Sequence, residues 1–329
     1  MKTIFSGVQP TGVLHIGNYF GALKQWVKLQ NDTDKMIYCI VDMHAITVPQ
    51  EPAVLKQNIT KIAAWLLAMG IDPEKSILFV QSDRPEHTEL MWILNTMTGM
   101  GQLERMTQYK EKSSKYENTM IGAGLFNYPT LMAADILLYK ATHVPVGDDQ
   151  KQHLELTRDL AERFNSKYGS SFVVPEPIIS QSGARVMGLD DPSKKMSKSA
   201  DSPLNFISLD DTDEVIRNKV KRAVTDSGNE IKSGADKPAM SNLLEIFAEA
   251  TGKTIAEIES EFVGKGYGEF KEALAEAIIA CLKPIRERYE RIIQDPAKIH
   301  QILAQGATKI EAEARSNIAE IKKKVGLGS

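Results

Sequence analysis

The chain has 329 residues, of which 42% are hydrophobic and 25% are charged, so it is long enough for one large or two modest hydrophobic cores. Its net charge of -3 argues against nucleic-acid binding through overall basicity, and any RNA contact must come from local basic patches. The two cysteines, Cys39 and Cys281, lie in apolar runs, which excludes a disulfide framework and a thiolate metal site. Without a bilayer-spanning apolar stretch or a signal sequence, we expect a cytoplasmic protein.

The N-terminal segment predicts a strand, a turn and the start of a helix. Residues 3–7 are rich in β-branched and aromatic types, a glycine turn follows over residues 7–12, and apolar residues recur at helical spacing over 16–23. The start of a helix carries unpaired N–H groups and partial positive charge, and this combination binds phosphate. His15 and Asn18 would add donors on the first turn. Taken alone, the segment fits a plain strand–helix connection as well as a phosphate site.

The remainder of the first half alternates strand-like and helix-like runs, which is typical of a doubly wound α/β domain. The exception is residues 87–120, which keep helical spacing without intervening strands and therefore predict an insertion. Pro129 suits the first turn of a helix expected over 127–140. The other expected strands are 36–41, 77–80 and 144–146, and the other expected helices are 54–69 and 150–165.

A face for an aromatic amino acid is indicated on the helix expected over 127–140. Tyr128, Met132 and Asp135 fall at i, i+4 and i+7 and so share one side of that helix. Asp135 could accept the N–H of an indole or the O–H of a phenol, so these residues leave tryptophan and tyrosine open. The alternative is that Tyr128 and Met132 are core residues and Asp135 is paired elsewhere. Residues placed to complete such a pocket are Phe5, Gln9, His44, Val144, Val146 and Gln150.

A second phosphate-handling segment, here called the lysine loop, is Lys195-Met196-Ser197-Lys198-Ser199, in a polar stretch rich in aspartate, serine and proline. Two ammonium groups three residues apart suit a loop that closes on a triphosphate and neutralises charge on leaving pyrophosphate. A basic, serine-rich loop by itself is more often a solvated surface. Together with the glycine turn and helix start, the lysine loop indicates ATP chemistry.

Strand signals disappear after the lysine loop, and helical periodicity continues with glycines and prolines between the segments. We expect a nucleotide-binding α/β domain over residues 1–190, with the insertion at about 84–125, and a helical domain over residues 191–329. The expected helices of the second domain are 213–224, 242–251, 255–262, 270–294 and 299–325.

The two loops resemble the HIGH-type and KMSKS signatures of class I aminoacyl-tRNA synthetases, here His15-Ile16-Gly17-Asn18 and the lysine loop. Over essentially its whole length the chain is similar to the bacterial tryptophanyl members of that family. The runs that carry this similarity are 9–19, 42–47, 106–113, 128–137, 144–153 and 225–227. The resemblance implies a Rossmann-like catalytic domain that activates L-tryptophan with ATP, releases pyrophosphate and transfers the amino acid to the 3′ end of tRNA(Trp), read by a helical anticodon-binding domain.

The resemblance also implies roles for individual residues. The phosphate-stabilising residues would be His15, Asn18, Lys195 and Lys198, with Lys112 of the insertion as a further candidate. The ATP site would comprise Gln9, Pro10, Thr11, Gly17, Asn18, Gly147, Asp148, Asp149, Val186, Lys195, Met196, Ser197, Lys198 and Ser199. The tryptophan site would comprise Phe5, Gly7, Gln9, His44, Tyr128, Met132, Asp135, Val144, Val146 and Gln150. The family more often has Glu at position 148, so Asp148 keeps the charge with a shorter reach.

Further partners follow from the same resemblance. It implies a homodimer with the insertion at the interface. The histidines and cysteines lack metal-ligand spacing, so we expect no metal held by the protein itself, and Mg²⁺ would accompany ATP. One candidate patch for RNA phosphates is the run Arg217, Lys219, Lys221 and Arg222.

Three other functions compete with this one. The nearest is a tyrosyl-tRNA synthetase, disfavoured by the residue runs 15–19 and 147–153. A small nucleotidyltransferase would share the helix start but not the long helical second half. A non-catalytic RNA-binding protein would not need both loops intact. Exchange of pyrophosphate with ATP, tested with each amino acid, separates all four.

Overall fold

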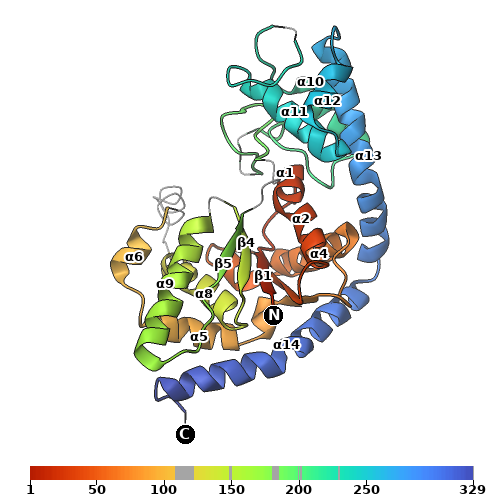
Figure 1. Cartoon of the computed structure of the whole chain (residues 1–329). Helices are drawn as coiled ribbons and strands as arrows, with labels where there is room; N and C mark the ends of the chain where they lie inside the picture. Colours follow the sequence, from red (N-terminus) through yellow and green to blue (C-terminus); the bar gives the residue numbers. More distant parts are fainter. Residues whose placement is uncertain are drawn as a thin grey trace.

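The structure, a computed structural model, describes residues 1–107, 122–147, 150–179, 185–198, 200, 202–228 and 230–328. These residues contain a five-stranded sheet in which every pairing is parallel, in the order β3-β2-β1-β4-β5 (Figure 1). The strands are β1 (Thr3–Val8), β2 (Lys35–Ile40), β3 (Ile77–Val80), β4 (His143–Val146) and β5 (Glu176–Ile179). The α/β fold class expected from the sequence is confirmed.

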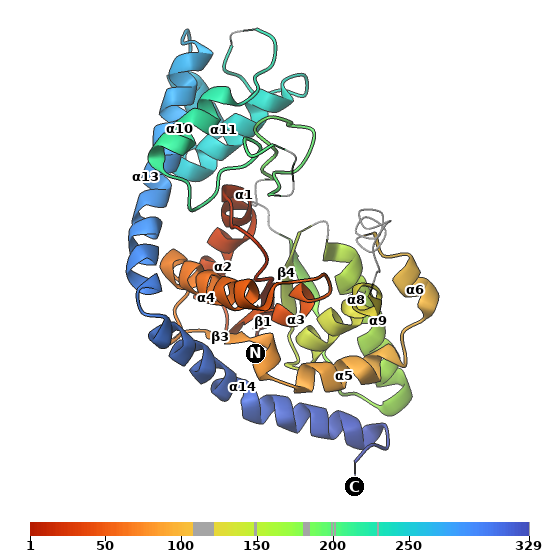
Figure 2. The same cartoon turned by 180° about the vertical axis from the view of Figure 1, so that it is seen from behind.

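Helices connect the strands and continue into a separate helical end of the molecule (Figure 2). Those of the α/β part are α1 (Ile16–Asn18), the π-helical turn η1 (Tyr19–Leu23), α2 (Lys24–Leu29), α3 (Asp42–Ala45), α4 (Pro52–Met69), the 3-10 turn η2 (Gln81–Asp83), α5 (Glu86–Asn95), α6 (Met100–Glu104), α8 (Ala123–Leu137) and α9 (Lys151–Tyr168). The later helices are α10 (Asp213–Arg222), α11 (Pro238–Thr251), α12 (Ile255–Glu261), α13 (Tyr267–Ile293) and α14 (Pro296–Lys324). All five later helices lie close to their expected bounds.

Both faces of the sheet are buried, as parallel sheets require. Successive residues of a strand point to opposite faces, so Met36 and Tyr38 of β2 enter a first core while Ile37 enters a second. The first core takes side chains from α2, α4 and the helical part, and the second from α5, α8 and α9. The sheet is thereby fixed from both sides, which gives the carboxyl ends of its strands a rigid position.

Strand β5 is absent from the sequence expectation. It pairs with β4 alone, at the edge of the sheet, and its residues are largely exposed. Pro177 follows Pro175 closely in the sequence, and the pair signals a break rather than a strand. An edge strand accepts proline because one side of its backbone needs no partner.

Helix α8 begins earlier than expected, at Ala123, so Pro129 lies inside the helix rather than in its first turn. Proline removes one backbone N–H from the helical ladder. The additional turn is stabilised by burial of Leu125, which is 2% exposed in the second core. Burying a leucine side chain contributes about 2 kcal/mol, enough to offset a missing hydrogen bond.

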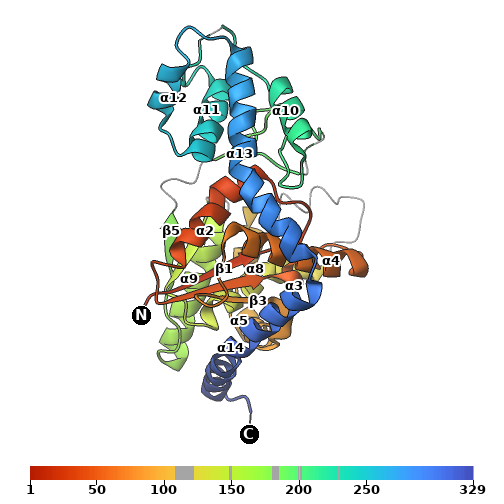
Figure 3. The same cartoon turned by 90° about the vertical axis from the view of Figure 1, so that its right-hand side faces the viewer.

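Helix α14 returns from the helical part to the α/β part and packs across β3 (Figure 3). Leu303 enters the first core and Ala307 the second, so the helix crosses the edge of the sheet from one face to the other. At the crossing, a Cβ built on Gly306 would lie 1.9 Å from the carbonyl oxygen of Leu78. The proposed division at residue 190 stays a prediction, and α14 lies on the α/β side of it in space.

Candidate active site

A cavity of about 690 Å³ opens at the carboxyl ends of β1 and β4. Strands β2 and β3 lie on one side of β1 and strands β4 and β5 on the other, so the strand order reverses here, the position at which doubly wound folds bind ligands. Its wall joins residues of β1, α1, α8, β4 and the lysine loop. The expected site residues that line it are Phe5, Gly7, Gln9, Thr11, His15, Gly17, Asn18, His44, Tyr128, Met132, Asp135, Val144, Val146, Gly147, Gln150, Lys195, Ser197 and Lys198.

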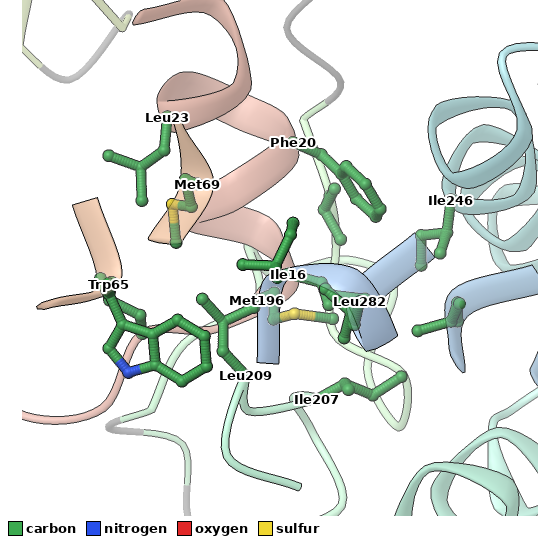
Figure 4. Close-up of a cluster of buried hydrophobic side chains, with 14 of the residues drawn as sticks. Ile16, Phe20, Leu23, Trp65, Met69, Met196, Ile207, Leu209, Ile246 and Leu282 are labelled. Carbon is green, nitrogen blue, oxygen red and sulfur yellow. The ribbon is translucent and has the colours of Figure 1, made fainter. Parts of the chain in front are cut away.

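Other expected residues stand apart from this wall. Pro10, Val186 and Met196 are not among the lining residues. Met196 is 2% exposed and packs in the first core beside Ile16 and Leu209 (Figure 4). Because the side chains of Val186 and Met196 fill the core, any contact of theirs with ATP would have to come from the backbone. Lys112, Asp148, Asp149 and Ser199 lie outside the described residues.

His15 stands at the start of α1 with an extended backbone, and its N–H donates to Asn18 Oδ1 at 3.1 Å. The imidazole is buried, and its Nδ1 has no partner among the described residues. Burial, followed by the charges of Lys198 and Lys195, lowers the pKa of His15 to about 4. His15 is therefore neutral at neutral pH and can offer one N–H donor without a charge of its own.

The lysine loop meets the glycine turn directly. The Nζ of Lys198 donates to the carbonyl oxygen of Thr11. Gly12 has φ 74°, a backbone conformation that favours glycine, and a Cβ there would also displace the Lys198 side chain. Burial lowers the pKa of Lys198. The two phosphate-handling segments thus border one space, although they lie far apart in the sequence.

Two asparagines fix the backbone of the lysine loop and of Met187, which pairs with Lys195 in an isolated β-bridge. Asn205 Oδ1 accepts the Ser197 N–H at 3.1 Å, while its Nδ2 donates to Asp190 Oδ1 at 2.5 Å. Asn242 of α11 accepts from the N–H of Met187 at 2.8 Å and donates to its carbonyl oxygen at 3.1 Å. The sequence analysis does not single out Asn205 or Asn242, because isolated asparagines carry no periodic or charge signal.

Asp135 lies in the cavity wall, but three side chains already donate to its carboxylate. Its Oδ1 accepts from His87 Nδ1 at 2.6 Å and from Gln81 Nε2 at 2.7 Å, and its Oδ2 accepts from His44 Nε2 at 2.8 Å. Burial by itself raises the pKa of Asp135, but the hydrogen bonds from His44 and His87 outweigh it and hold the pKa below its usual value. Asp135 therefore remains an ionised acceptor although it is 1% exposed.

Two histidines that the sequence analysis does not place at the site, His87 and His153, contact residues of the cavity wall. His87 is fully buried against Asp135, and His153 is fully buried with its Nε2 2.8 Å from the Tyr128 hydroxyl. The sequence offers no sign of either contact, because the partners lie 48 and 25 residues away along the chain. The sequence leaves open whether Tyr128 is a core residue or a pocket residue. In the structure it is both, because its side chain is buried and lines the cavity.

The basic patch expected on α10 is only partly available to a ligand. Arg217 pairs with Glu276 at 2.6 Å. Lys219 is 8% exposed, lies 2.7 Å from Asp211 Oδ2 and covers the ring of Phe206. Lys219 faces the core side of α10, so its charge serves the fold. Lys221 and Arg222 remain exposed.

Within the described ranges, no group of three histidine, cysteine, aspartate or glutamate side chains is placed to hold a metal ion. Across those same ranges, every helix is too short or too polar to cross a membrane.

Residues 1–283 match the protein family described as tRNA synthetases class I (W and Y). A tryptophan–tRNA ligase from Halalkalibacterium halodurans is 53% identical over 328 residues, which cover 99% of this chain and 98% of that protein. The crystal structure of tryptophanyl-tRNA synthetase from Mycoplasma pneumoniae superposes with a TM-score of 0.92 at 38% identity, covering 100% of this chain and 99% of the other. The structure of the Campylobacter jejuni enzyme complexed with ADP and tryptophan superposes with a TM-score of 0.84 at 40% identity, covering 99% and 100%.

Proposed function

The chain belongs to the class I tRNA synthetases for tryptophan and tyrosine, and from this premise we infer that it is a tryptophan–tRNA ligase. It activates L-tryptophan with ATP to tryptophanyl-adenylate and pyrophosphate and then transfers the tryptophanyl group to tRNA(Trp). The resemblance seen in the sequence is confirmed by relatives of about half identity over full length, and these favour tryptophan over tyrosine.

The observation that carries this function is the contact between the lysine loop and the glycine turn at one cavity. We propose that the phosphates of ATP lie between the start of α1 and the side chains of Lys195 and Lys198. The carboxylate of the amino acid attacks the α-phosphorus, and pyrophosphate leaves with the electron pair of the broken bond. The two ammonium groups stabilise the charge that develops there, and neutral His15 donates an N–H. Mg²⁺ would arrive with ATP and neutralise phosphate charge.

The other end of the cavity suits an aromatic amino acid. Phe5 and Val144 supply apolar walls, and Asp135 supplies a fixed acceptor for an indole N–H. Gln9 and Gln150, which line the same space, would fix the ammonium and carboxylate groups of the substrate. In this proposal the substrate carboxylate points toward the lysine loop, where the α-phosphorus must lie for the attack.

Exchange of labelled pyrophosphate into ATP tests the function directly. Each of the twenty amino acids is supplied alone, and we expect rapid exchange with tryptophan only. Charging of tRNA(Trp) with tryptophan should follow in a second assay. Tyrosine-dependent exchange would instead establish the tyrosyl alternative, and an absence of exchange with every amino acid would refute a synthetase function.

We propose that the helical part contacts tRNA, with Lys221 and Arg222 of α10 supplying part of the basic surface. Replacing both by alanine should weaken tRNA charging and spare pyrophosphate exchange, because α10 contributes no residue to the cavity wall. The log-log salt slope should fall by roughly 0.7 per lost contact with single-stranded RNA. Lys56→Ala, on the exposed side of α4, is the control. A protein that charges tRNA works in the cytoplasm, where translation takes place.

We also propose a homodimer through the face of α5 and α6. Trp92 and Met100 are 65% and 64% exposed on these helices, which belong to the insertion for which the family resemblance implies a dimer interface. Trp92→Glu should shift the protein from dimer to monomer in sedimentation velocity experiments. Val263→Glu changes another exposed apolar side chain, 79% exposed on the helical part, and should leave the dimer intact. A wild-type monomer would refute the proposal.

A further inference from the structure

Behind the cavity wall, a chain of buried polar groups runs from Tyr139 through His87 to Asp135. The hydroxyl of Tyr139 lies 2.7 Å from His87 Nε2, and His87 Nδ1 lies 2.6 Å from Asp135 Oδ1. Tyr139 and His87 are 1% and 0% exposed, and Asp135 is the one member that lines the cavity. Phe79 packs against both rings, with centroid distances of 6.0 Å to Tyr139 and 5.9 Å to His87. Apolar packing against Phe79 therefore also fixes the positions of Tyr139 and His87.

The two contacts of His87 fit one arrangement of protons along these side chains. Burial raises the pKa of Tyr139, so its phenol stays protonated and donates to His87 Nε2. With the phenol as donor, Nε2 of His87 is an acceptor, and its Nδ1–H donates to Asp135 Oδ1. Gln81 Nε2 donates to the same oxygen at 2.7 Å. Both acceptor positions of Oδ1 are thus occupied by buried donors.

The second oxygen of Asp135 differs from the first. Oδ2 accepts one hydrogen bond from within the described part of the chain, from His44 Nε2 at 2.8 Å. His44 itself lines the cavity. Since a carboxylate oxygen has two acceptor positions, one position of Oδ2 is left, and both Asp135 and His44 line the cavity.

We propose that His87 is a positioning residue that makes Asp135 present one acceptor, in one direction, to the indole N–H of tryptophan. The inference rests on the proposed function, because it concerns how the same cavity recognises its amino acid. His87 and Gln81 occupy Oδ1 and stop the carboxylate from rotating. When a variant removes the Nδ1 donor, Oδ1 loses one of its two hydrogen bonds. The carboxylate then rotates to find another donor for Oδ1, and this rotation turns Oδ2 away from the indole ring of the substrate.

The test compares L-tryptophan with its benzothienyl analogue, in which sulfur replaces the ring N–H, in pyrophosphate exchange. Wild-type protein should prefer tryptophan in kcat/KM by roughly tenfold or more, as expected for one hydrogen bond to a charged acceptor. His87→Asn keeps an amide N–H near the position of Nδ1 and should keep most of this preference. His87→Gln places its amide near the position of Nε2 and should lose roughly tenfold of it, through the KM for tryptophan. The KM for ATP should not change in either variant.

Equal preferences in the asparagine and glutamine variants overturn the inference, as does a wild-type protein that uses both amino acids equally well. A role of His87 in folding alone would lower the rates with both amino acids together and leave their ratio unchanged. Nitrogen-15 NMR of the wild-type protein tests the proposal without any substitution. The His87 proton should reside on Nδ1 at neutral pH, and a proton on Nε2 alone overturns the proposal. If no amino acid supports exchange, the proposed function fails, and the NMR measurement still decides the proton positions.

Discussion

Acidification should destabilise this protein through His15. The pKa of His15 in the folded chain is about 4, against an ordinary value of 6.5. Between these values the unfolded chain binds a proton that the folded chain excludes, so the contribution to stability is complete above pH 6.5 and is lost as pH falls toward 4. The full difference corresponds to about 3 kcal/mol, and about 2.5 kcal/mol of it should be lost by pH 4.5.

Urea unfolding at pH 7 and pH 4.5 measures this loss in the wild-type protein and in His15→Gln. Other titrating groups act in both proteins, so the difference between their two losses isolates His15. We expect the wild type to lose about 2.5 kcal/mol more than the variant. NMR titration of the imidazole provides a direct reading of the pKa. In Lys198→Ala that pKa should rise but stay well below 6.5, because burial is the largest cause of the shift and remains.

The reasoning fails if His15 titrates near 6.5, or if wild type and His15→Gln lose the same stability on acidification. A low pKa of His15 also matters for the mechanism, because it keeps the imidazole uncharged at neutral pH. A neutral imidazole near Lys195 and Lys198 adds no further positive charge to repel them, and the phosphates of ATP then meet two ammonium groups and one neutral donor.

The remaining predictions concern the lysine loop, the pocket carboxylate and the return of α14. Lys195→Ala and Lys198→Ala should each slow adenylate formation in stopped-flow experiments by about a hundredfold and leave tryptophan affinity nearly unchanged; equal losses in both would show a structural loop. Asp135→Ala and Asp135→Asn should weaken tryptophan binding by roughly 1–3 kcal/mol in calorimetry while ATP binding persists, and wild-type affinity would remove Asp135 from the site. Gly306→Ala should lower the thermal midpoint of unfolding, because the added methyl group would meet the β3 backbone. The control Gly268→Ala has open space around it and should preserve or raise the midpoint. Similar midpoints in both variants would contradict the close packing of α14 on β3.

The sequence predicts the parts of this fold that depend on local periodicity. Strands β1 to β4 and the later helices follow from apolar spacing, because each is decided by neighbours a few residues away. Strand β5 could not be predicted in this way, since Pro177 forbids the usual pattern and only the free edge of β4 makes the strand possible.

The candidate site also has one part that local sequence motifs predict and another part that they do not. The glycine turn and the lysine loop are short motifs, and most of the residues expected from them line the cavity. The partners of Asp135 are not contained in any motif. Gln81 of η2 and His87 of α5 come from 54 and 48 residues away, and α5 packs beside α8 in the fold. For Lys219 the sequence suggests a charge that is available to bind RNA. In the structure this charge is paired with Asp211.

The crossing of β3 by α14 bears on how the chain folds while it is being made. Strand β3 ends at Val80 and α14 begins at Pro296, so at bacterial rates of synthesis the edge of β3 waits on the order of ten to forty seconds for its cover. An uncovered strand edge can pair with another chain. The nascent protein therefore passes through a period in which its sheet is formed but open at β3, and a chaperone bound to that edge would have to be displaced by α14 as the helix leaves the ribosome.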